Sequence, residues 1–149
     1  MDIRQIVPEQ RSDFITLLQA NQLPYEDLPA DLQHFLVAIE QNNVIAAIGL
    51  EQYGTCGLLR SMVVHQAYRD RQVAASLVEA LETRAKKAGI GEIYLLTETA
   101  EAYFARKGYQ RVTRADVPQP LYASSEFSHV CPQSAVVMRK QLKEEAATL

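Results

Sequence analysis

The N-terminal part of the chain predicts a strand, a helix and then a loop. Residues 3–7 (IRQIV) alternate apolar and polar side chains, as in a half-buried strand. Within residues 9–23, Phe14, Leu17 and Leu18 recur at helical spacing, which predicts a helix with one apolar stripe. Residues 23–33 contain two prolines and are expected to be mainly loop.

The middle of the chain changes to the period of strands and then back to that of a helix. Residues 35–40, 44–53 and 57–64 are rich in β-branched and other apolar side chains, and short turns separate them. We expect three consecutive antiparallel strands here. Residues 73–87 return to helical spacing and end in two lysines, and a glycine stands two residues further on, the order typical of a helix C-terminus.

The last third predicts three further strands around one short helix. Residues 92–97 (EIYLLT) and 109–113 (YQRVT) are expected to be strands, and residues 100–107 a helix with Thr99 as its candidate N-cap. A proline-containing loop precedes the last strand, residues 134–142, which could pair within the chain or across a dimer.

Length, composition and charge fit one globular domain over residues 1–149. The chain is 48% apolar and 22% charged, with a formal charge of −3, so it lacks the excess of positive charge typical of nucleic-acid-binding proteins. Since no segment approaches the roughly 20 apolar residues of a membrane span, we expect no membrane contact and a cytoplasmic location. Cys56 and Cys131 are the only cysteines, too few for a disulfide framework or a paired-ligand zinc site, and no metal is expected.

Three segments resemble the GNAT superfamily of N-acetyltransferases: LLRSMVVHQAYRDRQVAASLVEAL, IYLLTETAEAYFARKGYQRV and SAVVMRKQL. More narrowly, the chain resembles small GNAT proteins found with bacterial arsenic-resistance genes and the acetyltransferase domain of N-acetylglutamate synthases. The resemblance implies a mixed α/β GNAT fold. In that fold a mostly antiparallel sheet of about six to seven strands carries helices on both faces, and one splayed strand pair receives acetyl-CoA.

The resemblance places acetyl-CoA at a strand and at the turn that follows it. Backbone groups of Met62, Val63 and Val64 would pair with the pantetheine arm. The pyrophosphate would lie on the turn and helix start formed by Arg69, Arg71, Gln72, Val73 and Ala74, where unpaired amides favour an anion. The family's turn has glycine where this chain has Gln72, a residue that enters the left-handed region less freely. Thr97 and Phe104 are further expected contacts of acetyl-CoA.

Acetyl transfer to an amine needs a base, and departure of the CoA thiolate is helped by an acid. Glu51 and His129 are the candidate bases. The alternatives are that Glu51 is a solvated strand residue and His129 an exposed loop histidine. Phe104 occupies the position where many GNAT enzymes have a tyrosine acid, and the adjacent Tyr103 is expected to point elsewhere on the helix. Because the thiolate has a thiol-like pKa, it can leave without an acid near neutral pH.

The acceptor implied by the resemblance is a small amine, an amino acid or an amino-acid-like compound such as an organoarsenical. Arg60 could pair with its carboxylate, or could be an exposed strand arginine, and Tyr53 could shape the pocket. The competing interpretation of Gln72 and Phe104 is a catalytically impaired relative that senses acyl-CoA or serves as an interaction module. The sequence is compatible with a monomer or a homodimer.

Overall fold

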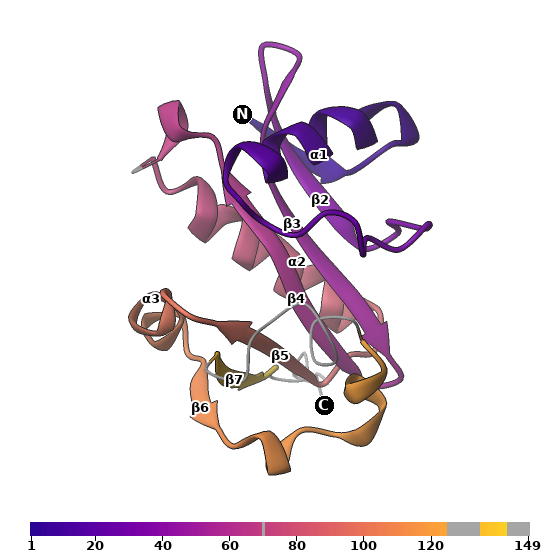
Figure 1. The fold of residues 1–149 in the computed structure, drawn as a ribbon, viewed down its shortest axis with the longest axis vertical. Helices are drawn as coiled ribbons and strands as arrows, with labels where there is room; N and C mark the ends of the chain where they lie inside the picture. Colours follow the sequence, from indigo (N-terminus) through magenta and orange to yellow (C-terminus); the bar gives the residue numbers. More distant parts are fainter. Residues whose placement is uncertain (70, 125–134, 143–149) are drawn as a thin grey trace, which may run out of the picture. The chain divides into compact units, whose positions relative to one another are not determined.

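The computed structural model describes residues 1–69, 71–124 and 135–142 (Figure 1). Its strands are β1 (Asp2–Gln5), β2 (Phe35–Glu40), β3 (Asn43–Tyr53), β4 (Cys56–Val64), β5 (Glu92–Thr97), β6 (Gln110–Val112) and β7 (Val136–Gln141). Its α-helices are α1 (Arg11–Ala20), α2 (Val73–Lys87) and α3 (Glu101–Arg106). Short 3₁₀ helices cover η1 (Pro8–Gln10), η2 (Gln66–Tyr68), η3 (Arg114–Asp116) and η4 (Gln119–Ala123).

The strands form one mixed sheet in the order β1-β2-β3-β4-β5-β7-β6. The pairings β1–β2, β2–β3, β5–β7 and β6–β7 are antiparallel, whereas β4–β5 is parallel. The predicted mixed α/β fold with a mostly antiparallel sheet is therefore confirmed. By internal contacts the chain divides into two compact units, Met1–Leu50 with Arg60–Arg84 and Glu51–Leu59 with Ala85–Leu149.

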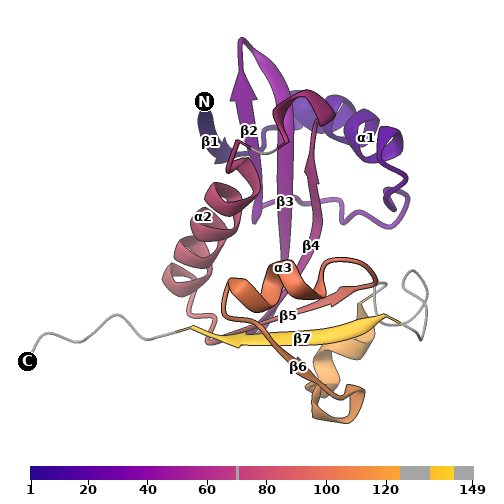
Figure 2. The ribbon, with the colours of Figure 1, turned by 90° about the vertical axis from the view of Figure 1, so that its left-hand side faces the viewer.

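In the first unit, α1 and α2 lie on opposite faces of the strands (Figure 2). Every residue of β2 except Glu40 is buried, as expected for a strand covered on both sides. Phe14, Leu17 and Leu18 of α1 join a core with alternate residues of β2, among them Val37. The predicted apolar stripe of α1 is thus confirmed, and residues 21–34 form turns and loop, as the prolines indicate.

The second unit is built around β5 and β7. Residues 92–97 of β5 pair with residues 136–141 of β7, and β6 pairs with the other edge of β7. Its core cluster contains the buried residues Leu58, Tyr94, Val117, Leu121 and Val137. The last strand is therefore an interior strand of its own chain, so the pairing left open by the sequence is made within the chain.

The predicted cap of α3 is wrong. The helix begins at Glu101 after Ala100, whose side chain offers no acceptor. The hydroxyl of Thr97, not that of Thr99, accepts a hydrogen bond from the Ala100 amide at 2.9 Å. Thr97 takes this role because it ends β5 three residues before Ala100, where the chain turns into the helix.

No helix within the described ranges combines the length and the apolarity needed to cross a membrane.

Candidate active site

The parallel ladder between β4 and β5 is short. It joins Cys56 to Glu92, Gly57 to Ile93 and Leu58 to Tyr94, and β4 then continues for six residues without a pair in β5. Those six include Met62, Val63 and Val64, of which only Val63 is buried. A strand that leaves its parallel neighbour in this way has main-chain groups available for another extended partner.

Ser61, in the same stretch of β4, has a φ of 58°. A non-glycine residue in the left-handed region interrupts regular strand geometry and costs about 1–2 kcal/mol. Such strain is concentrated at functional sites, where the surrounding structure imposes it. The irregularity falls between Arg60 and Met62, two residues that the sequence analysis singles out.

In the turn before α2, Gln72 has a backbone conformation that is usual for glycine, although the turn contains no glycine. Gln72 has a φ of 62°, in the region that glycine enters freely. The first bond of the helix runs from the Ser76 amide to the Gln72 carbonyl oxygen at 3.1 Å. The amides of Val73 and Ala74 precede that bond, so they belong to the group of helix-terminal donors that have no intrahelical acceptor.

Two exposed arginines flank this turn. Arg69 Nε donates to the Val64 carbonyl oxygen at 3.2 Å, and its Nη2 donates to Asn21 Oδ1 at the end of α1. The guanidinium carbon of Arg71 lies 5.3 Å from the centre of the Tyr68 ring, a cation–π contact. Arg69 thus fixes the turn to the end of β4, and both side chains add positive charge at the start of α2.

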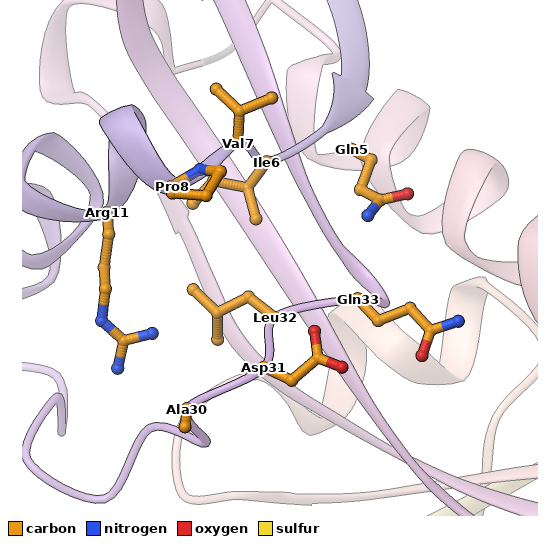
Figure 3. A pocket seen from close by; sticks show the side chains of 9 residues that line it. All are labelled: Gln5, Ile6, Val7, Pro8, Arg11, Ala30, Asp31, Leu32 and Gln33. Atoms are coloured by element: carbon orange, nitrogen blue, oxygen red, sulfur yellow. The ribbon is translucent and has the colours of Figure 1, made fainter.

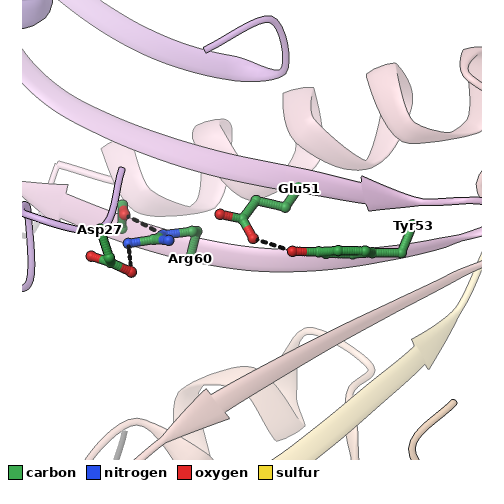
Figure 4. Close-up of polar contacts among 5 residues, drawn as sticks. Asp27, Glu51, Tyr53 and Arg60 are labelled. Atoms are coloured by element: carbon green, nitrogen blue, oxygen red, sulfur yellow. Dashed lines mark hydrogen bonds and ion pairs between the residues drawn. The ribbon is translucent and has the colours of Figure 1, made fainter. Parts of the chain in front are cut away.

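Arg60 is buried, so its interpretation as an exposed strand arginine is wrong. Its side chain is 0% exposed, and Nη2 lies 2.8 Å from Oδ2 of Asp27, whose side chain is 15% exposed. Its Nε donates to Ser61 Oγ at 3.1 Å. Figure 4 shows the guanidinium directed at the Asp27 carboxylate. The sequence analysis missed Asp27, because a loop carboxylate has no periodicity that would mark a buried partner.

Glu51 and Tyr53 are held together at the end of β3. The Tyr53 hydroxyl donates to Glu51 Oε1 at 2.7 Å, and both residues are half-buried (Figure 4). Because they are two apart on one strand, their side chains share a face. The hydrogen bond fixes the orientation of the candidate base.

The two aromatic residues of α3 differ in what they contact. Phe104 is 4% exposed and meets the Tyr109 ring edge to face at 5.4 Å, so it serves the core of the second unit. The Tyr103 hydroxyl is buried and, among the described residues, has no hydrogen-bond partner. Burial raises the pKa of Tyr103, which keeps its hydroxyl protonated at neutral pH.

Two residues singled out in the sequence, His129 and Cys131, lie outside the described residues. Cys56 has a free thiol whose pKa is raised by burial. Within the described ranges, no three His, Cys, Asp or Glu side chains form a group that could hold a metal ion.

A cavity of about 270 Å³ lies in the first unit, beside β1 and the end of the α1–β2 loop (Figure 3). Its walls combine an apolar surface from Ile6, Pro8 and Leu32 with the charged groups of Arg11 and Asp31. No predicted site residue lines this cavity. It is therefore distinct from the site predicted from the sequence.

The chain is similar to acetyltransferases in sequence and in structure. It is 26% identical over 96 residues to an amino-acid acetyltransferase of Mannheimia succiniciproducens; the match covers 63% of this chain and 22% of that relative. The fold matches N-acetylglutamate synthase from Neisseria gonorrhoeae, solved with coenzyme A and N-acetylglutamate, with a TM-score of 0.81 and 16% identity over 95% of this chain and 35% of that one. An aminoglycoside 6′-N-acetyltransferase solved with coenzyme A matches with a TM-score of 0.72 and 19% identity over 96% and 98% of the two chains.

The chain thus spans about a fifth of the length of the curated relative, and the structural matches show the fold alone. The family assignment comes from the model of the acetyltransferase (GNAT) family, which matches residues 3–115. That range includes β4, the turn with Gln72, α2 and β5. The chain belongs to the acetyltransferase (GNAT) family.

Proposed function

We propose that this protein transfers the acetyl group of acetyl-CoA to the amino group of a small acceptor, an amino acid or an amino-acid-like compound. Membership of the GNAT family supports the reaction type. The observation that carries the proposal is the turn before α2, where Gln72 has a φ of 62°, a conformation that glycine adopts freely. The amides that would bind an anion are main-chain groups, which a side-chain substitution leaves in place.

For the donor, Met62, Val63 and Val64 bind the pantetheine arm through the backbone of β4. The pyrophosphate lies at the amides of Gln72, Val73 and Ala74, with charge from Arg69 and Arg71. The Gln72 side chain must turn away from the phosphates, so we expect weaker binding than with glycine. Thr97 and Phe104 are further proposed contacts of acetyl-CoA.

When bound, acetyl-CoA supplies the acetyl group as a thioester. A base takes one proton from the acceptor's ammonium, the resulting amine nitrogen bonds to the acetyl carbon as the carbon–sulfur bond breaks, and the nitrogen then releases its second proton to water, which leaves the amide and CoA. Glu51, oriented by the Tyr53 hydroxyl, is the proposed base, and His129 is the alternative. Phe104 cannot donate a proton to the thiolate, which leaves as such or is protonated by water.

For the acceptor, the proposal is that Arg60 binds the carboxylate and Tyr53 contacts the side chain. The support is that the Arg60 guanidinium pairs with a carboxylate in the structure, that of Asp27, and lies on the strand proposed to bind the donor. The amino-acid acetyltransferase similarity favours an amino acid as the acceptor. The resemblance to N-acetylglutamate synthases makes a glutamate-like amino acid the first to test. The resemblance to arsenic-linked GNAT proteins adds an amino-acid-like organoarsenical to the acceptors to be tested.

The test is the rate of CoA thiol release with saturating acetyl-CoA and a panel of amino acids, including one amino-acid-like organoarsenical. We expect one or more acceptors to give a saturable rate above hydrolysis, and the same acceptor with its amino group acetylated beforehand to give none. Calorimetric titration with acetyl-CoA measures the donor site separately.

The same measurements separate the enzyme from the alternative, a catalytically impaired GNAT protein that senses acyl-CoA. Binding of acetyl-CoA without acceleration by any acceptor would support the sensor. Absence of acetyl-CoA binding would reject both.

A further inference from the structure

Arg69 is held at the turn before α2 by two neutral acceptors within the first unit. Its Nε donates to the Val64 carbonyl oxygen at 3.2 Å, and its Nη2 donates to Asn21 Oδ1. No carboxylate of the described ranges forms an ion pair with Arg69. Because a carbonyl oxygen and a side-chain amide oxygen carry no net charge, these bonds fix the guanidinium and leave its positive charge intact.

The side chain of Asn21 is itself fixed from two sides. Asn21 directly follows α1, and its main-chain amide donates to the Leu18 carbonyl oxygen at 3.1 Å. Its side-chain Nδ2 donates to the Leu17 carbonyl oxygen at 2.9 Å, while Oδ1 accepts from Arg69. Since Leu17 offers an acceptor and Arg69 a donor, only one orientation of the Asn21 amide satisfies both. Asn21 thus joins the end of α1 to the turn before α2.

Three of the five N–H donors of the Arg69 guanidinium are left for a ligand. The bonds to Val64 and Asn21 use the Nε donor and one donor of Nη2, so both donors of Nη1 and the second of Nη2 have no partner among the described residues. Arg69 is exposed, so a ligand can reach these donors from solvent. The planar array of donors on a guanidinium matches the oxygens of a phosphate group.

An arginine that is ordered before a ligand arrives binds an anion more tightly than a mobile one. A free arginine side chain samples many rotamers, and the entropy lost when a ligand orders it opposes binding. In the protein, the bonds to Val64 and Asn21 have already ordered Arg69. The amide at position 21 also matters for charge, because a carboxylate there would hold Arg69 but would neutralise the charge that attracts a phosphate.

We propose that Asn21 is a positioning residue, which holds Arg69 so that the remaining donors of its guanidinium bind the pyrophosphate of acetyl-CoA. The inference rests on the proposed function, in which the pyrophosphate lies at the turn before α2. It extends the donor site to the end of α1, an element that the proposed donor contacts do not include. Asn21 acts on the ligand only through Arg69.

The experiment measures by calorimetry the Kd of the full chain for CoA, dephospho-CoA and pantetheine. Dephospho-CoA lacks the 3′-phosphate but keeps the pyrophosphate, whereas pantetheine has no phosphate. The variants are Asn21→Asp, Asn21→Ala, Arg69→Gln and the double variant that combines Asn21→Asp with Arg69→Gln. Gln19→Glu is the matched control, because it adds the same negative charge at an exposed position in the last turn of α1.

We expect Asn21→Asp to raise the Kd for CoA and for dephospho-CoA alike, by about 3- to 10-fold, because the new carboxylate neutralises Arg69. Asn21→Ala should raise both by about 2- to 5-fold, because Arg69 keeps its charge but becomes mobile. Pantetheine binding should not change in any variant, and Gln19→Glu should have a smaller effect than Asn21→Asp. In the Arg69→Gln background, Asn21→Asp should add no more than Gln19→Glu does. A purely structural contact would be kept by aspartate, which pairs with Arg69, and would leave the Kd unchanged.

An unchanged Kd in both Asn21 variants, or an equal rise for pantetheine, would overturn the inference. A rise for CoA alone would place Arg69 at the 3′-phosphate and would also overturn it. So would an effect of Asn21→Asp that persists undiminished in the Arg69→Gln background. If the Asn21→Asp and Asn21→Ala variants do not fold, Asn21→Gln displaces the amide by one methylene and should raise the Kd for the two phosphate-bearing ligands only.

The outcomes separate this inference from the proposed function. If the wild type binds CoA and acetylates an acceptor while the Asn21 variants bind CoA as tightly, the role of Asn21 is rejected and the proposed function stands. If the wild type binds CoA but no acceptor turns over, the proposed function is rejected, and the Kd values of the variants still decide the role of Asn21. Absence of CoA binding by the wild type would reject both.

Discussion

At the scale of single residues, Gln72 shows that a turn can keep a glycine conformation without glycine. Its φ of 62° costs about 1–2 kcal/mol relative to an unstrained residue. Ser61, with a φ of 58°, adds a second strained position on the strand that precedes this turn. Both lie among residues proposed to bind acetyl-CoA or the acceptor, which is where backbone strain is usually retained.

Gly49 illustrates the opposite requirement, a glycine needed for space. It pairs with Phe35 across β2 and β3, and a Cβ at Gly49 would lie 2.3 Å from Phe35 Cε2. Phe35 is 1% exposed and meets the Phe14 ring edge to face at 5.9 Å, so its ring has little room to move. We expect Gly49→Ala to lower the free energy of unfolding by about 1–3 kcal/mol, measured by urea denaturation.

Gly91 provides the control for this prediction. A Cβ at Gly91 would meet no other atom within 4 Å. Gly91→Ala should therefore leave stability almost unchanged or raise it slightly through the unfolded state. If Gly49→Ala were as stable as Gly91→Ala, the inference that Phe35 leaves no room for a Cβ at Gly49 would be wrong.

At the scale of elements, the short helix η3 is closed by one carboxylate. Asp116 Oδ2 accepts hydrogen bonds from the Thr113 amide at 3.1 Å and from the Thr113 hydroxyl at 2.9 Å. These two bonds, the backbone one first, hold the pKa of Asp116 below its ordinary value. A carboxylate whose folded pKa is lowered stabilises the fold at pH values above its unfolded pKa, and this contribution disappears as the pH falls through the folded pKa.

We therefore expect the Asp116 carboxyl carbon to titrate at a lower pH in the folded protein than in an unfolded peptide, measured by NMR. Thr113→Val removes the hydroxyl donor but keeps the amide donor and the side-chain shape. The pKa of Asp116 should rise in that variant without reaching the unfolded value. An unchanged pKa in Thr113→Val would show that the hydroxyl contributes nothing to closing η3.

At the scale of the whole molecule, the sequence predicts elements well where apolar residues form a continuous run or recur with a regular spacing. The strands over β2 and β3, the stripe of α1 and the end of α2 follow from local spacing, because each element buries one or both faces along its length. The turn at Gln72 was found through the resemblance to a family, since a glycine-free turn has no signal of its own.

The parts that the sequence did not predict depend on contacts between distant positions. Asp27 and Arg60 are 33 residues apart, and nothing in the order of residues shows that a loop carboxylate compensates a buried strand arginine. The prediction of Thr99 as the cap of α3 is wrong for a related reason. The hydroxyl that accepts the bond belongs to Thr97, a strand residue whose side chain reaches the next helix only after the chain has turned. Periodicity describes faces of elements, and it does not describe side chains that join one element to another.

Acetyl-CoA binding should raise the free energy of unfolding of the protein. A ligand that binds only the folded protein adds about 2.7 kcal/mol to the free energy of unfolding at a concentration 100-fold above its Kd. We expect the Tm to rise with acetyl-CoA concentration and to rise further in Gln72→Gly, since that variant removes the side chain from the phosphate turn.

Gln22→Gly is a matched control because Gln22 also has a positive φ, 58°, but lies at the end of α1. Both substitutions should stabilise the ligand-free protein by about 1 kcal/mol through relief of left-handed strain. Only Gln72→Gly should lower the Kd for acetyl-CoA. Equal ligand-induced shifts in the two variants would show that the Gln72 side chain does not restrict the phosphate site, and a Tm that stays constant with acetyl-CoA would contradict binding at the turn altogether.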